Sequence, residues 1–252
     1  MKTVKELINL KNRKALVVGG SGHIGRAVCG TLEELGSDVA IMDLEGEGNF
    51  FFPCDLRDEK AIRCCAREVI QKLGGLDVLV HCAAYVGTTK DAGWAVPFEE
   101  QTVEAWDKAL RVNVTSAFVL AQECHKALQN SGHGSVILFS SIYGMVGPDL
   151  RLYEETSMAN PAGYNASKGG ILQLSRYLAT LLAPAIRVNA ISPGGVWRSQ
   201  PEAFHERYKK RTPLGRMATE EDMKGAIAYL ASDLSKYVTG HNLVIDGGYT
   251  IW

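Results

Sequence analysis

Short apolar runs alternate with longer amphipathic stretches along most of the chain. The apolar runs lack the strict alternation of a half-exposed strand, so they predict strands buried on both faces of a parallel sheet. Seven such runs occur, at residues 14–20, 39–43, 50–55, 76–84, 134–141, 185–192 and 241–248. Helical periodicity occupies residues 25–36, 57–75, 99–130, 161–184 and 219–232. With right-handed crossovers, this order predicts an α/β, Rossmann-like fold: a doubly wound parallel seven-stranded sheet with helices on both faces.

No internal repeat, low-complexity tract or linker divides the sequence of 252 residues. That length suits one large α/β domain or two small ones, and the unbroken succession of strands and helices favours one. We predict a single dinucleotide-binding and catalytic domain over residues 1–252, with substrate loops at about residues 145–162 and 196–213.

Composition and charge exclude several functions. Lys+Arg total 27 against Asp+Glu 28, and the net charge of −1 argues against a nucleic-acid surface. No apolar run approaches the roughly 20 residues that cross a bilayer, and residues 1–14 lack the apolar stretch of a signal peptide. The cysteines show no C-x-x-C spacing and the histidines are scattered, which predicts free thiols and no metal site. We expect a cytoplasmic protein that binds neither nucleic acid nor membranes.

Glycines 19, 22 and 25 lie three apart where the first predicted strand turns into a helix. Glycine permits the tight turn and lets the backbone approach a pyrophosphate at the helix N-terminus. The context of a strand before and a helix after supports dinucleotide binding. The predicted cofactor contacts in this turn are Gly19, Ser21, Gly22, His23, Ile24 and Gly25.

Asp43, at the end of the second predicted strand, favours NAD over NADP. Its carboxylate can accept hydrogen bonds from the ribose hydroxyls and would repel a 2′-phosphate. The glycine turn also lacks Arg and Lys. Asp43 could instead only cap a turn before Gly46. Asp55, which ends the third predicted strand beside Leu56, could reach the adenine amino group.

The stretch PAGYNASKGG, residues 161–170, places Tyr164 and Lys168 four positions apart. At that spacing two helical residues project from the same face. Pro161 and the two glycines at 169 and 170 argue against an exposed surface helix. Taken alone, such a pair could still arise by chance.

The chain resembles the single-domain branch of the short-chain dehydrogenase/reductase family over almost its whole length. The resemblance is carried, in order, by the glycine turn, Asp55, VNVTSAF, SSIYG, YNASK, NAISPGGV, PLGR and TGHNLVIDGG. It implies a catalytic group of Asn113, Ser141, Tyr164 and Lys168. It also implies further cofactor contacts, which are Ala83, Ala84, Tyr164, Lys168, Pro193, Gly194 and Val196.

The resemblance gives each catalytic residue a role. A free tyrosine has a pKa near 10, and lowering it by about 3 units takes roughly 4 kcal/mol. One ammonium at about 4 Å supplies about that much at an effective dielectric near 20, so Lys168 would tune Tyr164 as general acid/base. Ser141 would hydrogen-bond the substrate oxygen; it is preferred to Ser140 because Ser-x-x-Gly is the family pattern. Asn113 would hold a water linking Lys168 to solvent, or would only mark a helix kink.

Three departures from the family pattern bear on binding. His23 stands at the usual middle glycine, with Gly22 displaced by one, which looks more like the longer sugar-nucleotide branch. The run from His81 to Ala84 replaces Asn-Asn-Ala-Gly, which mainly supports the sheet and the cofactor. Trp197, Arg198 and Ser199 follow SPGGV where a threonine is common. Arg198 could bind a substrate anion or could simply be solvated.

The segment between Ser141 and Tyr164 is longer than usual for the family. With residues 197–211, interpreted as a mobile lid, it should form the substrate pocket. Its rim favours a hydroxyl-rich or charged substrate over a long acyl chain, because it includes Arg151, Tyr153, Glu154, Glu155, Arg198 and Gln200. The predicted substrate contacts are Ser141, Tyr143, Tyr164 and Arg198. The segment is also similar to oxidoreductases of bacterial surface-sugar and flagellin-glycan pathways.

These observations predict an NAD-dependent oxidoreductase that transfers a hydride between a secondary alcohol, sugar- or polyol-like, and nicotinamide. The alternatives are a 3-oxoacyl-thioester reductase using NADPH and a non-catalytic dinucleotide-binding regulator. The apolar faces of residues 114–128 and 169–182 exceed what one sheet face needs, and the resemblance implies that such helices pair across a dimer axis. The terminal Trp252 could also reach a neighbouring subunit. We expect a homo-oligomer, a tetramer or a dimer.

Overall fold

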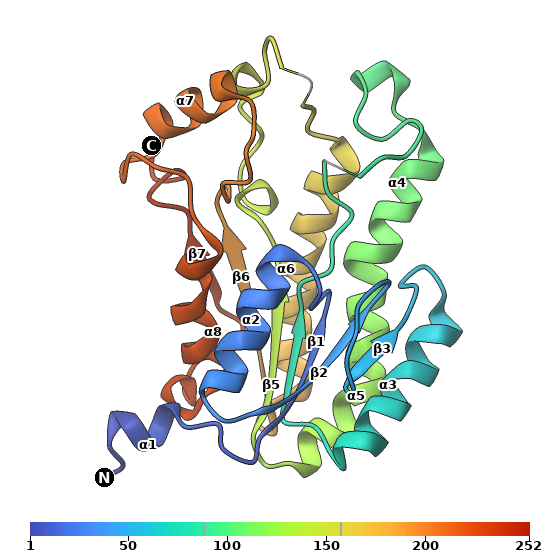
Figure 1. Ribbon diagram of the computed structural model, residues 1–252, viewed down its shortest axis with the longest axis vertical. Coiled ribbons are helices and arrows are strands. Elements are labelled where there is room, and N and C mark those ends of the chain that lie inside the picture. The colour runs from blue at the N-terminus through green and yellow to red at the C-terminus, as the bar shows by residue number, and fades with distance from the viewer. Residues whose placement is uncertain (88, 157) are drawn as a thin grey trace.

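One parallel sheet of seven strands forms the centre of the molecule (Figure 1). The structure, a computed structural model, describes residues 1–252 except residues 88 and 157. The strand order is β3–β2–β1–β4–β5–β6–β7, and every neighbouring pair is parallel. The strands are β1 Lys14–Val18, β2 Asp38–Asp43, β3 Phe51–Pro53, β4 Val78–His81, β5 Gly134–Phe139, β6 Ile186–Pro193 and β7 Asn242–Ile245. The predicted fold is confirmed.

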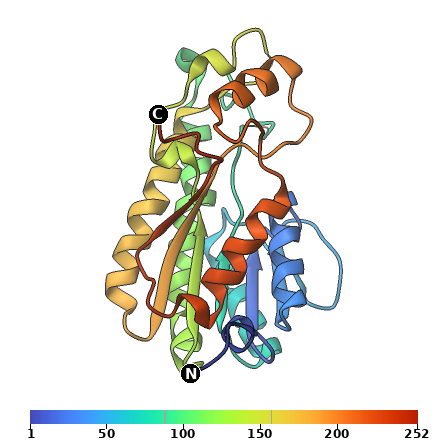
Figure 2. The same ribbon diagram turned by 90° about the vertical axis from the view of Figure 1, so that its left-hand side faces the viewer.

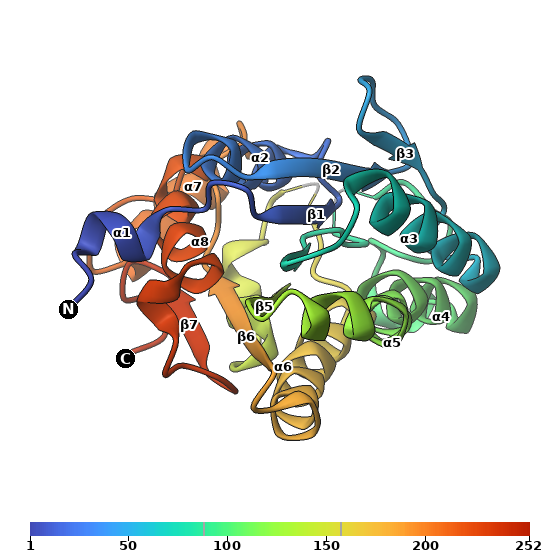
Figure 3. The same ribbon diagram turned by 90° about the horizontal axis from the view of Figure 1, so that it is seen from below.

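Helices cover both faces of the sheet, as the lack of alternation in the strands predicted. Seen from below, α2 and α8 lie on one side, and α3, α5 and α6 lie on the other (Figure 3). Each side encloses its own apolar core, and β4 and β5 are buried along their whole length between them. The helices that cover the sheet are α2 His23–Glu34, α3 Glu59–Leu73, α5 Ser116–Asn130, α6 Ala162–Leu182 and α8 Lys224–Ala231.

Sequence signals set several helix ends. The Asp58 side chain accepts hydrogen bonds from the backbone N–H groups of Lys60 and Ala61 and so caps the start of α3. Gly74, with φ at 70°, ends the same helix in the left-handed conformation that glycine adopts without strain. Thr219 and Asp222 form a capping box, which opens a 3-10 turn, Glu220–Met223, before α8.

A π-helical turn joins two helices within residues 99–130, where the sequence predicted helical structure. Helix α4, Val103–Leu110, runs through the π-turn Arg111–Thr115 into α5. The π-turn contains Asn113, and turns of this kind often mark functional sites.

Helix α7, Glu202–Arg211, forms a cap above the carboxyl ends of the strands, at the opposite end of the molecule from the N-terminus and α1, Val4–Ile8 (Figure 2). From the sequence we interpreted this segment as a mobile lid and predicted no apolar core for it. Phe204 and Tyr208 of α7 pack with Leu152, Met217 and Tyr249, which come from distant segments. The cap is therefore held together by a small aromatic core of its own.

Of the helices in the described residues, none is both long enough and apolar enough to cross a membrane. The remaining 3-10 turns are Phe98–Glu100, Ile142–Gly144, Leu150–Leu152 and Asp233–Ser235.

Candidate active site

The strand order reverses beside β1, because β1 pairs with β2 on one side and β4 on the other. In doubly wound sheets, ligands bind outside the carboxyl ends of the strands at such a point. The predicted glycine turn and the predicted catalytic residues all lie at this edge.

The glycine turn is packed too tightly for other residues at two of its positions. A Cβ on Gly19, whose φ is 81°, would lie 2.5 Å from the Ala83 backbone nitrogen. A Cβ on Gly25 would lie 2.0 Å from the Gly19 carbonyl oxygen. Gly22 is the N-cap of α2 and offers no side-chain acceptor, so the first N–H groups of that helix can meet an anion. The turn therefore fits a dinucleotide pyrophosphate.

Asp43 closes the same turn from the end of β2. Its Oδ2 accepts a hydrogen bond of 3.0 Å from the Ser21 backbone N–H, and its Oδ1 accepts one of 2.8 Å from Leu44. The carboxylate thus stands beside the glycine turn, where the ribose contact was predicted. The ribose contact itself stays a prediction.

Asp55 is paired with a residue that the sequence reasoning did not consider. The Arg57 guanidinium donates to both of its carboxylate oxygens and holds the pKa of Asp55 below its ordinary value. Leu56 beside it is buried. A contact of Asp55 with adenine would have to coexist with the bound Arg57, and it stays a prediction.

The predicted catalytic residues come together at the first turns of α6. Lys168 is buried; its Nζ donates a 2.8 Å hydrogen bond to the Phe139 carbonyl and lies 5.6 Å from the centre of the Tyr164 ring. The Ser141 hydroxyl lies near Tyr164, where it acts to lower the pKa of the phenol. The neighbouring Ser140 instead donates to the Lys168 carbonyl at 2.8 Å and fixes the helix. This difference in partners supports the choice of Ser141.

Burial dominates the electrostatics of the pair. Desolvation raises the pKa of Tyr164, while the Ser141 hydroxyl and the charge of Arg198 act in the opposite direction. Burial also lowers the pKa of Lys168 from 10.5 to about 8. Removing the phenolate from water thus opposes the lowered pKa expected for Tyr164, and the tuning of Tyr164 by Lys168 stays a prediction.

Asn113 is buried and bonded to its surroundings on both sides. Its Oδ1 accepts from the Tyr85 backbone N–H at 2.6 Å, and its Nδ2 donates to Ser167 Oγ at 2.8 Å. This geometry agrees with the helix-kink reading, since Asn113 lies in the π-turn. The water-holding role stays a prediction.

His81 supports the π-turn from the end of β4. Its Nε2 lies 2.7 Å from Ser116 Oγ, which donates to the Val112 carbonyl at 2.6 Å. With the serine proton committed to Val112, the ring nitrogen is the donor to Ser116. Burial and the neighbouring charge of Lys168 lower the pKa of His81 to about 3, so the ring is neutral.

The nicotinamide end of the predicted cofactor set is tied to the cap. Gly194 follows Pro193 and donates from its N–H to the Ile245 carbonyl. A Cβ on Gly194 would lie 2.9 Å from the hydroxyl oxygen of Tyr208, which accepts from the Gly195 N–H at 2.5 Å. Val196 forms a bridge with Ala218 beyond them.

Of the predicted substrate residues, Tyr143 and Arg198 each contact a different set of neighbours. The Tyr143 hydroxyl lies 3.0 Å from that of Tyr153, to which the Asn160 amide donates at 3.1 Å. Arg198 is not free, because its Nε donates to Glu220 Oε1 at 3.2 Å. The same oxygen lies 3.9 Å from His23 Nδ1. Glu220, which the sequence reasoning missed, thus connects the cap loop with the glycine turn. Residue 157 of the first substrate loop lies outside the described residues.

Tyr85 and Trp94, which follow the predicted cofactor contacts Ala83 and Ala84, also reach the site, although the sequence reasoning gave them no role. Trp94 is buried in a cluster that includes Tyr85 and Tyr164. A Cβ on Gly163 would lie 3.1 Å from the Trp94 ring. Tyr85 donates to Asp91, which also binds Lys108 at 2.6 Å. The sequence feature that could have indicated this role is the presence of two aromatic residues, Tyr85 and Trp94, within an otherwise polar stretch.

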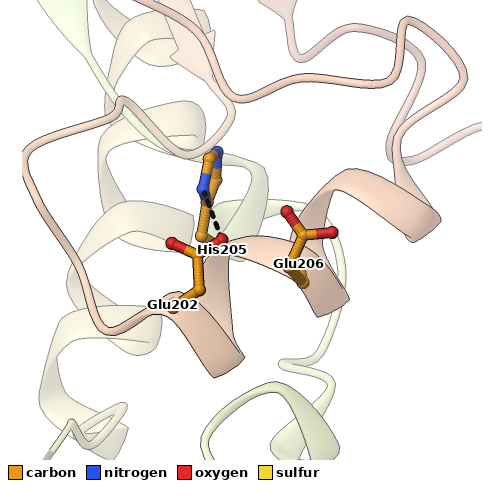
Figure 4. A group of neighbouring side chains, drawn as sticks. All are labelled: Glu202, His205 and Glu206. Carbon is orange, nitrogen blue, oxygen red and sulfur yellow. Dashed lines mark ion pairs between the residues drawn. The ribbon is translucent and has the colours of Figure 1, made fainter.

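Glu202, His205 and Glu206 bring three possible metal ligands together on α7, within 4.8 Å of one another (Figure 4). Each group has another explanation. His205 stacks on Trp197 with ring centres 4.0 Å apart, Glu206 pairs with Lys209 at 2.5 Å, and the Glu202 side chain is 76% exposed. The cluster gives no reason to assign a metal, and the expected absence of one stays a prediction.

The comparisons with known proteins place the chain in a family. A family model described as "Enoyl-(Acyl carrier protein) reductase" matches residues 20–250. A "Probable galactose dehydrogenase" of Rhizobium meliloti is 33% identical, over 95% of this chain and 96% of that protein. The D-threitol dehydrogenase of Mycolicibacterium smegmatis is 30% identical, over 96% and 94%. The post-translational flagellin modification protein A of Campylobacter coli is 30% identical, over 95% and 99%.

Solved structures support the same family. A short-chain dehydrogenase from Leptospira borgpetersenii with bound NAD⁺ is 33% identical with a TM-score of 0.87, over 99% of this chain and 96% of that one. The NADPH-dependent 3-quinuclidinone reductase of Rhodotorula rubra is 28% identical with a TM-score of 0.83, over 100% and 96%. The chain belongs to the short-chain dehydrogenase/reductase family and is an oxidoreductase, as the sequence motifs indicated.

Proposed function

We propose that the protein is an NAD-dependent dehydrogenase, or the corresponding ketone reductase, that acts on a secondary alcohol of sugar or polyol type. The observation that carries this proposal is the meeting of Ser141, Tyr164 and Lys168 beside the glycine turn. Relatives named for galactose and threitol support the substrate class. The hydrogen-bonded group of Tyr143, Tyr153 and Asn160 supports it too, because hydroxyls and amides suit a hydroxyl-rich substrate.

The glycine turn, Asp43 and the strap from Pro193 to Val196 would hold the coenzyme, which accepts or returns the hydride when bound. Tyr164 takes the proton from the substrate hydroxyl in oxidation and returns it to the oxygen in reduction. Ser141 donates a hydrogen bond to that oxygen and stabilises its developing charge. Lys168 holds positive charge beneath the ring, and the pKa of about 8 keeps most of that charge at pH 7.

The substitution Tyr164→Phe tests this mechanism. Loss of the proton donor should reduce turnover by about 10²- to 10⁴-fold, while NAD affinity stays nearly unchanged. Substrates are found by following NADH absorbance with polyols, sugars, sugar phosphates and hydroxy acids. Tyr237→Phe is the matched control, since Tyr237 is a fully exposed tyrosine before β7. Activity that survived Tyr164→Phe would refute the mechanism, and unchanged NAD binding without any turnover in the wild type would favour a non-catalytic regulator.

The reduction of an acyl thioester with NADPH is the second candidate. It is favoured by the family model, whose description names an acyl-carrier-protein reductase, and by the NADPH-dependent structural relative. Turnover of a 3-oxoacyl thioester with NADPH, in the absence of activity on polyols, would select it.

We further propose a homotetramer in the cytoplasm. Phe118 on α5 and Tyr177 and Leu181 on α6 are exposed apolar side chains on the two helices predicted to pair between subunits.

A further inference from the structure

An open hollow in the surface, with a volume of about 360 Å³ and called the cavity below, lies where α7 meets the turn at residues 149–152 and the C-terminus. In Figure 1 the C-terminus lies beside α7. None of the residues that line the cavity is one that we assign to the coenzyme or to the reacting atoms. The lining residues are Asp149, Arg151, Leu152, Arg207, Lys210, Arg211 and Trp252.

The cavity wall holds four cationic side chains and one carboxylate, and that carboxylate is already paired. Arg151 donates to both oxygens of Asp149, at 2.7 and 2.8 Å, and holds the pKa of Asp149 below its ordinary value. Arg207 hydrogen-bonds the Glu154 carbonyl and lies 3.7 Å from the Glu155 carboxylate, whose side chain is 88% exposed. Such an exposed pair is largely screened by water.

The other two cations have donors left over. Within the part of the chain that the structure describes, Lys210 makes no ion pair or side-chain hydrogen bond, and Arg211 Nε is buried without a hydrogen-bond partner. The nearest acid to Arg211 is Asp149, at 3.9 Å. The Arg211 guanidinium also lies over the Tyr249 ring, 5.3 Å from its centre, and its side chain is 36% exposed. Its accessible N–H groups therefore remain open to an anionic acceptor, which would form charge-assisted hydrogen bonds with them.

The end of α7 explains part of this arrangement. Cations in the last turn of a helix interact favourably with its dipole, which accounts for Lys210 and Arg211 as charges. The dipole does not account for Arg151, which belongs to another segment, or for the hollow between them. The dipole also does not explain the position of Trp252, whose indole lines the cavity and donates a 2.9 Å hydrogen bond to the Arg211 carbonyl.

We propose that this cavity binds a small organic anion through a phosphate or carboxylate group. Lys210 Nζ and the accessible N–H groups of the Arg211 guanidinium, whose side chain is 36% exposed, donate to the anionic oxygens, and the Trp252 indole covers the apolar part of the molecule. The volume suits a molecule of about the size of a sugar phosphate or a tricarboxylate. The bound anion bridges three segments of the cap whose inner side carries Tyr153, Phe204 and Tyr208. It therefore stabilises the cap that frames the proposed substrate site.

Calorimetric titration with inorganic phosphate and with citrate, against sodium chloride at matched ionic strength, tests the proposal. The wild type should bind at least one of the two saturably, and the one bound more tightly shows whether phosphate or carboxylate is preferred. The double substitution Lys210→Gln/Arg211→Gln should weaken binding about tenfold or more, the loss expected for two charge-assisted hydrogen bonds.

The control Lys5→Gln/Lys11→Gln removes two exposed charges at the far end of the molecule and should bind as the wild type does. Lys210→Gln alone, whose side chain is exposed, keeps the test valid if the double variant is unstable. The absence of saturable binding in the wild type, or equal affinity in wild type and Lys210→Gln, would overturn the proposal. Binding is measured without turnover, so its failure leaves the proposed oxidoreductase activity untouched, and a failure of that activity leaves the anion site untouched.

Discussion

At the scale of single residues, Asp43 combines a structural contact with a chemical preference. Its two oxygens already accept the N–H groups of Ser21 and Leu44, so the carboxylate is held in place before any ligand binds. A fixed negative charge discriminates against a phosphate more strongly than a mobile one, because it cannot turn away.

We predict that the wild type binds NAD more tightly than NADP and that Asp43→Asn reduces this preference about tenfold or more, since a charge is lost while an acceptor remains. Titration of both nucleotides measures the effect. Asp38→Asn, an exposed carboxylate at the other end of β2, should leave the preference unchanged. A wild-type preference for NADP would show that Asp43 does not choose the coenzyme.

At the scale of elements, the π-turn shows how a buried histidine can hold helix geometry. His81 reaches from β4 to Ser116, at the start of α5, and its ring must be neutral to stay buried beside Lys168. The folded protein binds the ring proton only near pH 3, whereas the unfolded chain binds it near the ordinary value of 6.5. Between those values the unfolded state holds more protons, so stability falls as the pH drops.

We therefore predict that the free energy of unfolding falls less steeply between pH 6.5 and 3 in His81→Asn than in the wild type. Urea titrations at several pH values give that slope. The matched control is His133→Asn, a half-exposed histidine before β5, which should keep the wild-type slope. Equal slopes in wild type and His81→Asn would mean that protonation of His81 does not cause the loss of stability at low pH.

The elements differ in how well the sequence predicted them. Strands such as β2 and β5 were located within a few residues, because an apolar run buried on both faces has few other readings. The meeting of Ser141, Tyr164 and Lys168 followed from family motifs. The core around α7 could not be predicted, since Phe204 and Tyr208 gain their partners from Leu152 and Tyr249 far along the chain. The pairing of Arg198 with Glu220 was missed for the same reason.

At the scale of the whole molecule, the parallel sheet gathers residues from across the chain at one edge, because every strand ends on the same side. That leaves the outer faces of α5 and α6 without a role in the site. Tyr177 is 58% and Leu181 60% exposed, which is unusual for large apolar side chains next to each other on one helix.

We predict that the wild type sediments as a tetramer and that Tyr177→Lys/Leu181→Lys shifts it to a smaller species, because buried cations would disfavour the contact between subunits. Val4→Lys, an exposed apolar residue on α1, serves as the control. A wild type that sediments only as a monomer would contradict the proposed assembly.

The seat of the Tyr208 hydroxyl against Gly194 and Gly195 has a practical consequence for redesign. If the cap is replaced to change the substrate specificity, Tyr208, Gly194 and Gly195 have to be kept together. A methyl group at either glycine, or a bulkier ring at position 208, would push the replaced cap away from the strand ends and let water into the active site.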